Sequence, residues 1–82
     1  MVTVLFDSSF ERTIKKIKNN KIKERLKKQI KKIVFSPGIG KPMRYTRKNT
    51  REFYVSPYRL SYIYIKKDNK LIFLDIYHKD KQ

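Results

Sequence analysis

The chain has 82 residues, of which 22 are Lys or Arg and 7 are Asp or Glu, so its formal net charge is +15. That length predicts a single domain over residues 1–82, and a domain of this size buries only about 60% of the surface that its unfolded chain exposes. The absence of Cys excludes a disulfide framework and a Cys-based zinc site. No apolar run approaches the roughly 20 residues of a membrane span, and the N-terminus has no signal-peptide pattern. We therefore expect a cytoplasmic protein that does not enter a membrane.

The positive charge is spread along the whole chain. Residues 1–40 hold 11 basic and 3 acidic residues, and residues 41–82 hold 11 and 4. Either the whole surface is basic, or the fold gathers charge from both halves onto one face. The natural partners of such a surface are nucleic acid, an acidic protein or anionic lipid, although many of these side chains could simply be solvated.

The first half predicts a short strand followed by two helices. Thr3 to Phe6 has the composition of a strand, and Ser8-Ser9-Phe10-Glu11 has the pattern of a capping box with Ser8 as the N-cap. Apolar residues then recur at helical spacing, interrupted by Asn19-Asn20. The two apolar stripes are Phe10, Ile14 and Ile17, then Ile22, Leu26, Ile30 and Ile33. Two antiparallel helices joined by a tight turn are the expected result.

The second half predicts strands. Ser36 to Pro42 is the strongest turn signal in the chain, and three β-rich segments follow it. These segments are residues 52–55, 58–65 and 71–77. The fold class is therefore α+β, with an N-terminal strand, an antiparallel helical hairpin and then a sheet of three to four mostly antiparallel strands. Residues 43–45 are a candidate for a further short strand.

Alternation along the last two strands predicts which residues face the helices. In the last strand Ile72, Leu74 and Ile76 are expected to point inward, with Phe73, Asp75, Tyr77 and Lys79 on the other face. In the strand before it, Leu60, Tyr62 and Tyr64 are expected in the core, which leaves Arg59 and Ser61 on the open face. An open face with Arg and Tyr beside a basic loop is suited to hold a phosphate chain.

The residue types present favour chemistry on a phosphate without a metal or cofactor. One His and scattered carboxylates cannot supply three or four metal ligands at familiar spacing. Cleavage of RNA by its own 2′-hydroxyl needs cations to neutralise the phosphorane and a group of near-neutral pKa to move protons. Candidates for these tasks are Arg59, Arg51, Arg44, Lys41, His78, Lys79 and several Tyr. Each also has an ordinary explanation, since a lone His is often a surface residue and an Arg that opens a strand often pairs with a carboxylate.

The order of motifs in the second half resembles the RelE/ParE superfamily of toxins from toxin–antitoxin systems, and its RelE/YoeB-like branch in particular. The Tyr58-Arg59-Leu60-Ser61-Tyr62 stretch is the most telling segment. The series that carries the resemblance runs from Gly40-Lys41-Pro42 through Arg51-Glu52-Phe53-Tyr54-Val55 to Leu71 to His78. The N-terminal strand and helical hairpin also fit, so the resemblance covers nearly the whole chain and implies a RelE-like microbial-ribonuclease fold.

The resemblance implies a metal-free, ribosome-dependent endoribonuclease that cuts mRNA in the A site and is silenced by an acidic, RelB-like antitoxin in a hetero-oligomer. By position, Arg59 matches the Arg that stabilises the scissile phosphate, His78 matches a His that transfers a proton, and Arg51 matches a basic residue on the preceding strand. Further contacts to RNA are then expected from Lys41, Arg44, Arg47, Lys48, Tyr77 and Lys79.

Two departures from the family pattern leave the general base unassigned. Met43 follows Pro42 where the YoeB branch has a Glu in this loop, and the chain ends Lys79-Asp80-Lys81-Gln82 where many RelE-like chains have a functional Tyr. Two other functions stay open. One is a ParE-like toxin that inhibits DNA gyrase without nuclease activity, and the other is a catalytically weak basic RNA-binding module.

Overall fold

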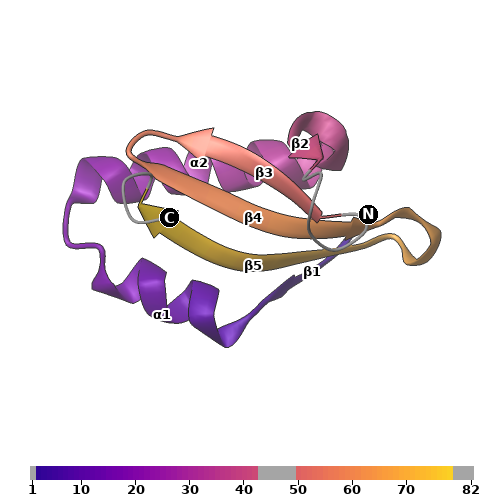
Figure 1. Ribbon diagram of the computed structural model, residues 1–82, viewed down its shortest axis with the longest axis horizontal. Coiled ribbons are helices and arrows are strands. Elements are labelled where there is room, and N and C mark those ends of the chain that lie inside the picture. Colours follow the sequence, from indigo (N-terminus) through magenta and orange to yellow (C-terminus); the bar gives the residue numbers. More distant parts are fainter. Residues whose placement is uncertain (1, 43–49, 79–82) are drawn as a thin grey trace.

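A computed structural model describes residues 2–42 and 50–78 of the chain. It contains strand β1, two α-helices, a short 3-10 helix, strands β2 to β4, a second 3-10 helix and strand β5 (Figure 1). Their bounds are β1 Thr3–Phe6, α1 Ser8–Lys16, α2 Asn20–Phe35, η1 Pro37–Ile39, β2 Lys41–Pro42, β3 Thr50–Val55, β4 Tyr58–Ile65, η2 Lys66–Asp68 and β5 Lys70–His78. The expected order of elements is confirmed, and the predicted strand at residues 43–45 lies outside the described residues.

The two helices begin at side-chain caps. The predicted N-cap of α1 is wrong by one residue, because Asp7, not Ser8, accepts a hydrogen bond from the Ser9 N–H at 3.0 Å. A carboxylate at this position satisfies a free N–H and interacts favourably with the positive end of the helix. Asn19 caps α2 through the N–H groups of Lys21 and Ile22. In the described part of the chain, neither helix is long and apolar enough to cross a membrane.

The sheet has five strands in the order β1-β5-β4-β3-β2. The pairs β3–β4 and β4–β5 are antiparallel, as expected, and β2, which lies in a segment predicted as a turn, also pairs antiparallel with β3. The N-terminal strand β1 pairs in parallel with β5, so the sheet is mixed. Parallel neighbours need a long crossover connection, which here includes both helices and the rest of the sheet.

The core lies between one face of the sheet and the two helices. Figure 1 shows α1 running below β5 and α2 running behind β3 and β4. Phe10 of α1 packs on Phe73 of β5 with ring centroids 5.2 Å apart, and Leu26 and Ile33 of α2 are completely buried. Leu60 and Tyr62 of β4 are also completely buried, which confirms that they face inward. Tyr64, the third residue predicted to face inward, is partly buried against the same core. We call this side of the sheet the helix face, and the other side the open face.

The predicted inward face of β5 is wrong in its first half. Leu71 and Phe73 are fully buried, whereas Ile72 and Leu74 are only partly so. The register with β4 changes between Ser61 and Tyr62, and this leaves Leu74 as an extra residue. Such a β-bulge shifts the alternation by one residue, which returns Ile76 to the core and leaves Asp75 and Tyr77 on the open face.

Candidate functional site

The turn after α2 is fixed to the sheet by Tyr62. Its hydroxyl donates a hydrogen bond to the Pro37 carbonyl at 2.8 Å and accepts one from the Gly40 N–H at 2.9 Å. A Cβ at residue 40 would lie 2.5 Å from the Tyr62 hydroxyl, so this close approach requires Gly. The contact determines where Lys41, the next residue, enters the sheet.

Arg51 holds the same turn from the neighbouring strand. Its Nη1 donates hydrogen bonds to the carbonyls of Gly40 at 2.7 Å and Gly38 at 3.2 Å. Because Arg51 is paired with Tyr62, the two side chains extend from the same face of the sheet, which is the helix face. The structure therefore places this predicted catalytic residue away from Arg59 and gives it a role in shaping the turn.

On the open face, Arg59 and Tyr77 converge on Glu52. Arg59 of β4 forms a salt bridge with Glu52 Oε1 at 3.0 Å, and the Tyr77 hydroxyl donates to Glu52 Oε2 at 2.7 Å. The two side chains of the salt bridge are 29% and 24% exposed, so water reaches both only in part. The three groups come from three adjacent strands, with Arg59 on the central one.

Arg59 has further capacity to bind an anion. Its guanidinium lies 6.0 Å from the centre of the Tyr54 ring, and its buried Nε has no hydrogen-bond partner within the described residues. An unpaired buried donor is unfavourable, and the part of the side chain that is open to an anion is its exposed 29%. A planar guanidinium offers a fork of donors that matches the oxygens of phosphate.

A hollow of about 450 Å³ opens beside Arg59. Lys41 lies on this side as well, because it is paired with Glu52 across β2 and β3. The hollow is lined by Ile39, Lys41, Glu52, Phe53, Tyr54 and Arg59. Lys41 and Arg59, two cations that were predicted to act on a phosphate, thus line the same hollow. The Tyr54 side chain lines it as well.

The Tyr77 hydroxyl holds its proton strongly. Burial, followed by the hydrogen bond to Glu52 and the charge of that carboxylate, raises the pKa of Tyr77 to about 12, against 10.0 for an ordinary Tyr. The phenol is therefore protonated at neutral pH and acts as a donor toward the open face.

His78 lies on the other face of the sheet from Arg59. Its partner across β4 and β5 is Tyr58, whose ring meets the imidazole edge-on with centroids 5.6 Å apart and packs against the core. The Arg59–Tyr77 pair is one position along and therefore points the opposite way. The structure does not bring His78 together with Arg59. The remaining predicted contacts, Arg44, Arg47, Lys48 and Lys79, lie outside the described residues.

Glu52 is the residue of this site that the sequence analysis did not select. It appeared only as part of a β-rich segment. A signal was present, because a two-residue turn at Ser56-Pro57 pairs Val55 with Tyr58 and so determines the register of both strands. That register sets Tyr54 opposite Arg59 and Glu52 opposite Ser61, all on one face.

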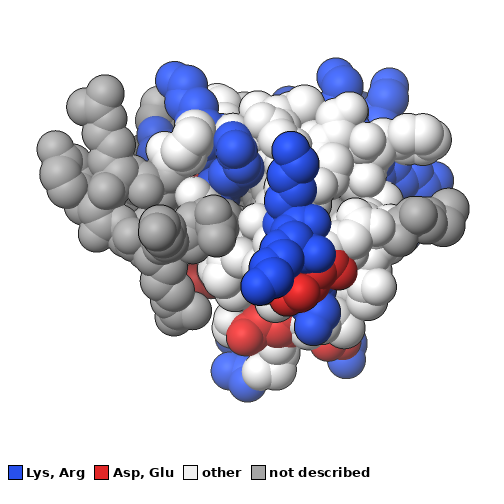
Figure 2. Space-filling model, turned by 90° about the vertical axis from the view of Figure 1, so that its right-hand side faces the viewer, with Lys and Arg blue, Asp and Glu red and all other residues white. Residues whose placement is uncertain are grey.

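Basic side chains also lie on the surface beyond this site. Figure 2 shows Lys and Arg spread across the end of the molecule that it faces, with acidic groups only in the lower half of the view. Among residues 2–42 and 50–78, no three His, Cys, Asp or Glu side chains are grouped so that they could hold a metal ion. The described surface therefore offers an anion several attractive positions, and the hollow at Arg59 is one of them.

Comparison with protein families gives a match over nearly the whole chain. Residues 4–82 match the ParE toxin of the type II toxin–antitoxin system parDE. A search of curated protein sequences found no match.

Several solved structures of toxins have the same fold. The intact RelBE toxin–antitoxin complex of E. coli contains a chain that is 20% identical, with a TM-score of 0.82 and complete coverage of both chains. The isolated E. coli RelE toxin is 19% identical with a TM-score of 0.82, and the match covers 100% of this chain and 88% of that one. The RelB–RelE complex of Methanococcus jannaschii is 20% identical with a TM-score of 0.74, covering 93% and 91%. These likenesses establish the fold that the sequence motifs predicted.

Proposed function

The chain belongs to the ParE toxin family of type II toxin–antitoxin systems, and we propose that it acts as a ribosome-dependent mRNA endonuclease that arrests translation in the cytoplasm. The observation that carries the proposal is Arg59 on the open face, beside Lys41 and a hollow of about 450 Å³. The match in fold to RelE toxins and the motif around Arg59 support this activity over a purely structural role for the cations.

In this reaction the nucleophile is the 2′-hydroxyl of the RNA. It attacks the adjacent phosphate, a cyclic 2′,3′-phosphate forms, and the 5′-oxygen of the next nucleotide leaves. Arg59 neutralises the charge that develops on the phosphorane, which is where electrostatic stabilisation contributes most. Lys41 binds the backbone at the β2 edge of the hollow, and Tyr54 or Tyr77 provides a surface on which a base stacks. Neither a metal nor a cofactor takes part.

Primer extension on mRNA in translating ribosomes tests this function. The parent protein should cut the mRNA at discrete positions and leave 5′-hydroxyl ends. The cuts should persist when EDTA is added at a concentration that the ribosomes tolerate. Arg59→Ala should lower the cleavage rate by a factor of about 100 or more, because loss of one preorganised donor commonly has that effect. Arg12→Ala, which removes an exposed Arg from α1, is the matched control and should cut normally. Equal cleavage by the Arg59→Ala protein would contradict the proposal.

Inhibition of DNA gyrase is the second candidate, and the family match to ParE favours it. A supercoiling assay with purified gyrase separates the two functions. Inhibition of supercoiling by the parent protein, with intact mRNA on ribosomes, would establish the second candidate in place of the first.

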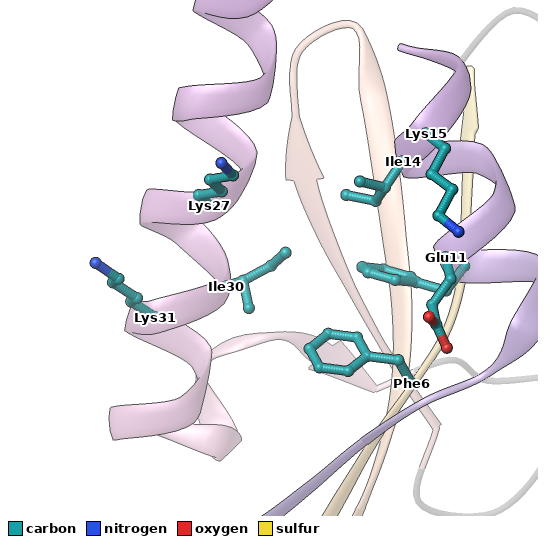
Figure 3. Close-up of a pocket in the computed structure, with 8 residues that line it drawn as sticks. Phe6, Glu11, Ile14, Lys15, Lys27, Ile30 and Lys31 are labelled. Atoms are coloured by element: carbon teal, nitrogen blue, oxygen red, sulfur yellow. The ribbon is translucent and has the colours of Figure 1, made fainter.

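A cognate acidic antitoxin is the expected partner, as the RelB-bound toxin structures suggest. We propose that an amphipathic helix of this antitoxin binds the groove of about 430 Å³ between α1 and α2. Figure 3 shows Ile14 and Ile30 pointing toward each other across this groove, with Phe6 at its lower end in the view. Lys15, Lys27 and Lys31 line its sides. An apolar helix face with flanking carboxylates complements this combination.

Neutralisation in cells tests the groove. Co-expression of the antitoxin should restore growth to cells that express the parent toxin. A Lys27→Glu, Lys31→Glu double variant should escape neutralisation, because it replaces attraction by repulsion at exposed positions. A matched variant, Lys18→Glu with Lys21→Glu, changes the same charge at exposed positions outside the groove and should still be neutralised. Equal neutralisation of both double variants would place the antitoxin elsewhere.

A further inference from the structure

We propose that Glu52 is the general base that takes the proton from the 2′-hydroxyl and that Tyr77 is the general acid that protonates the leaving 5′-oxygen. This assignment rests on the proposed endonuclease function. It supplies the general base that the sequence analysis left unassigned, in part because Met43 follows Pro42.

The geometry of the Glu52 carboxylate carries the inference. One oxygen is bound by Arg59 at 3.0 Å and the other by the Tyr77 hydroxyl at 2.7 Å. A scissile phosphate that binds the Arg59 guanidinium competes with Glu52 for the same donors. Glu52 Oε1 then loses its hydrogen-bond partner while it stays beside the bound phosphate. The 2′-hydroxyl lies on the ribose that carries this phosphate, so a released carboxylate beside the phosphate is placed to accept its proton.

The other titratable groups of the sheet are less well placed. Asp75, the second carboxylate on the open face of β3 to β5, accepts a hydrogen bond from the Ile76 N–H at 2.8 Å and is not bound to Arg59 in the described contacts. His78 extends from the helix face beside Tyr58.

Glu52 and Tyr77 belong to the two strands that flank the central strand, and the Tyr77 side chain crosses that strand to bring its hydroxyl 2.7 Å from the Glu52 carboxylate. Glu52 comes from β3 and Tyr77 from β5, with Arg59 on β4 between them. Attack and departure in an in-line displacement also take place on opposite sides of the phosphorus. A phosphate that enters between the Glu52 carboxylate and the Tyr77 hydroxyl, in place of their hydrogen bond, therefore has the base on one side and the acid on the other.

Protons and electrons balance within this set of residues. The O2′–H bond breaks as its proton passes to Glu52, and the O2′ lone pair forms the new bond to phosphorus. The bond from phosphorus to the 5′-oxygen breaks, and the Tyr77 hydroxyl gives that oxygen its proton. Glu52 is left as a carboxylic acid and Tyr77 as a phenolate. Transfer of one proton from Glu52 to Tyr77 along their hydrogen bond then restores both groups.

Two variants and two substrates test the assignment on translating ribosomes. Glu52→Gln keeps the size of the side chain but cannot accept the proton, and we expect its single-turnover cleavage rate to fall by about 100-fold or more. It should bind uncleavable mRNA with a 2′-deoxy nucleotide at the cut site at least as tightly as the parent, because Arg59 is no longer neutralised. Asp75→Asn, the matched control on the same face, should cleave at the parental rate.

A substrate with sulfur in place of the bridging 5′-oxygen separates the two roles. A thiolate leaves without protonation, so this substrate should restore the rate of Tyr77→Phe and leave Glu52→Gln slow. Circular dichroism of each variant identifies loss of fold.

The outcomes distinguish this inference from the function on which it rests. If Arg59→Ala abolishes cleavage while folded Glu52→Gln cuts at the parental rate, the base is another group and the endonuclease function stands. If the parent cuts no mRNA and inhibits gyrase, both proposals are wrong. A rate defect of Tyr77→Phe that persists with the sulfur substrate would overturn the acid role alone.

Discussion

The two faces of the sheet have different chemistry, and the difference separates stability from function. The helix face is closed by Phe10, Leu26 and Ile33, which are almost completely buried against Leu60 and Phe73. Burial of such side chains contributes about 1.5–3 kcal/mol each to folding. The open face instead carries an ion pair, a tyrosine hydroxyl and a hollow. Partly exposed ion pairs contribute only about 0–1 kcal/mol, so the open face can be specialised for a ligand with little effect on the fold.

The largest effect on stability is expected from the helix face. Leu26→Ala leaves a cavity in a fully buried position of α2 and should reduce the free energy of unfolding by about 2–5 kcal/mol. Urea denaturation followed by circular dichroism measures this loss. Lys28→Ala, an exposed substitution on the same helix, should change stability by no more than about 0.5 kcal/mol. Similar losses for both variants would mean that α2 contributes through its own helicity and not through packing.

An intermediate effect is expected where the helix face meets the turn. Tyr62→Phe removes the hydroxyl that joins the Pro37 carbonyl and the Gly40 N–H, and leaves the buried N–H without a partner. The free energy of unfolding should fall by about 1–3 kcal/mol. Cleavage should also slow in the fraction that remains folded, because the turn positions Lys41. Tyr64→Phe on the same strand is the control. A stable Tyr62→Phe protein with parental activity would show that Arg51 alone holds the turn.

A small effect on stability is expected on the open face. Glu52→Gln should lower the free energy of unfolding by no more than about 1 kcal/mol, because both partners of its ion pair with Arg59 are partly exposed. The same substitution should reduce cleavage strongly, as argued above. Urea denaturation at low and high salt measures the first effect. A loss above about 2 kcal/mol, with activity falling in proportion, would make Glu52 a structural residue and weaken the contrast between the faces.

A further effect on stability is expected at alkaline pH. The pKa of Tyr77 is raised to about 12 in the folded protein, against 10.0 for the unfolded chain, so the folded state binds the proton more tightly. The stabilisation is complete below pH 10 and is lost as the pH rises from 10 through 12. Urea denaturation between pH 9 and pH 12 should therefore show a shallower decline for Tyr77→Phe than for the parent. Burial also raises the pKa of Tyr62, so part of the decline should remain. Equal slopes would mean that Tyr77 titrates normally.

The local pattern of the sequence was sufficient for most of the elements. The apolar spacing of α2 predicted Leu26 and Ile33 in the core, and both are completely buried. The segment from Tyr58 to Ile65 is a strand with the predicted bounds, and alternation within it placed Arg59 on the open face. The sequence analysis grouped His78 with Arg59 on the basis of the family resemblance, whereas His78 follows Tyr77 by one residue and therefore extends from the other face.

The sequence by itself determined the order of elements, the inward stripe of α2 and the family, because these depend on the spacing of residues along one segment. The tertiary structure decided which groups meet. The β-bulge at Leu74 lies in a strand that is apolar on both sides, so alternation alone could not locate the core face of β5. The carboxylate of Glu52 gained its significance only when β3, β4 and β5 came together and brought Arg59 and Tyr77 within hydrogen-bond distance of it.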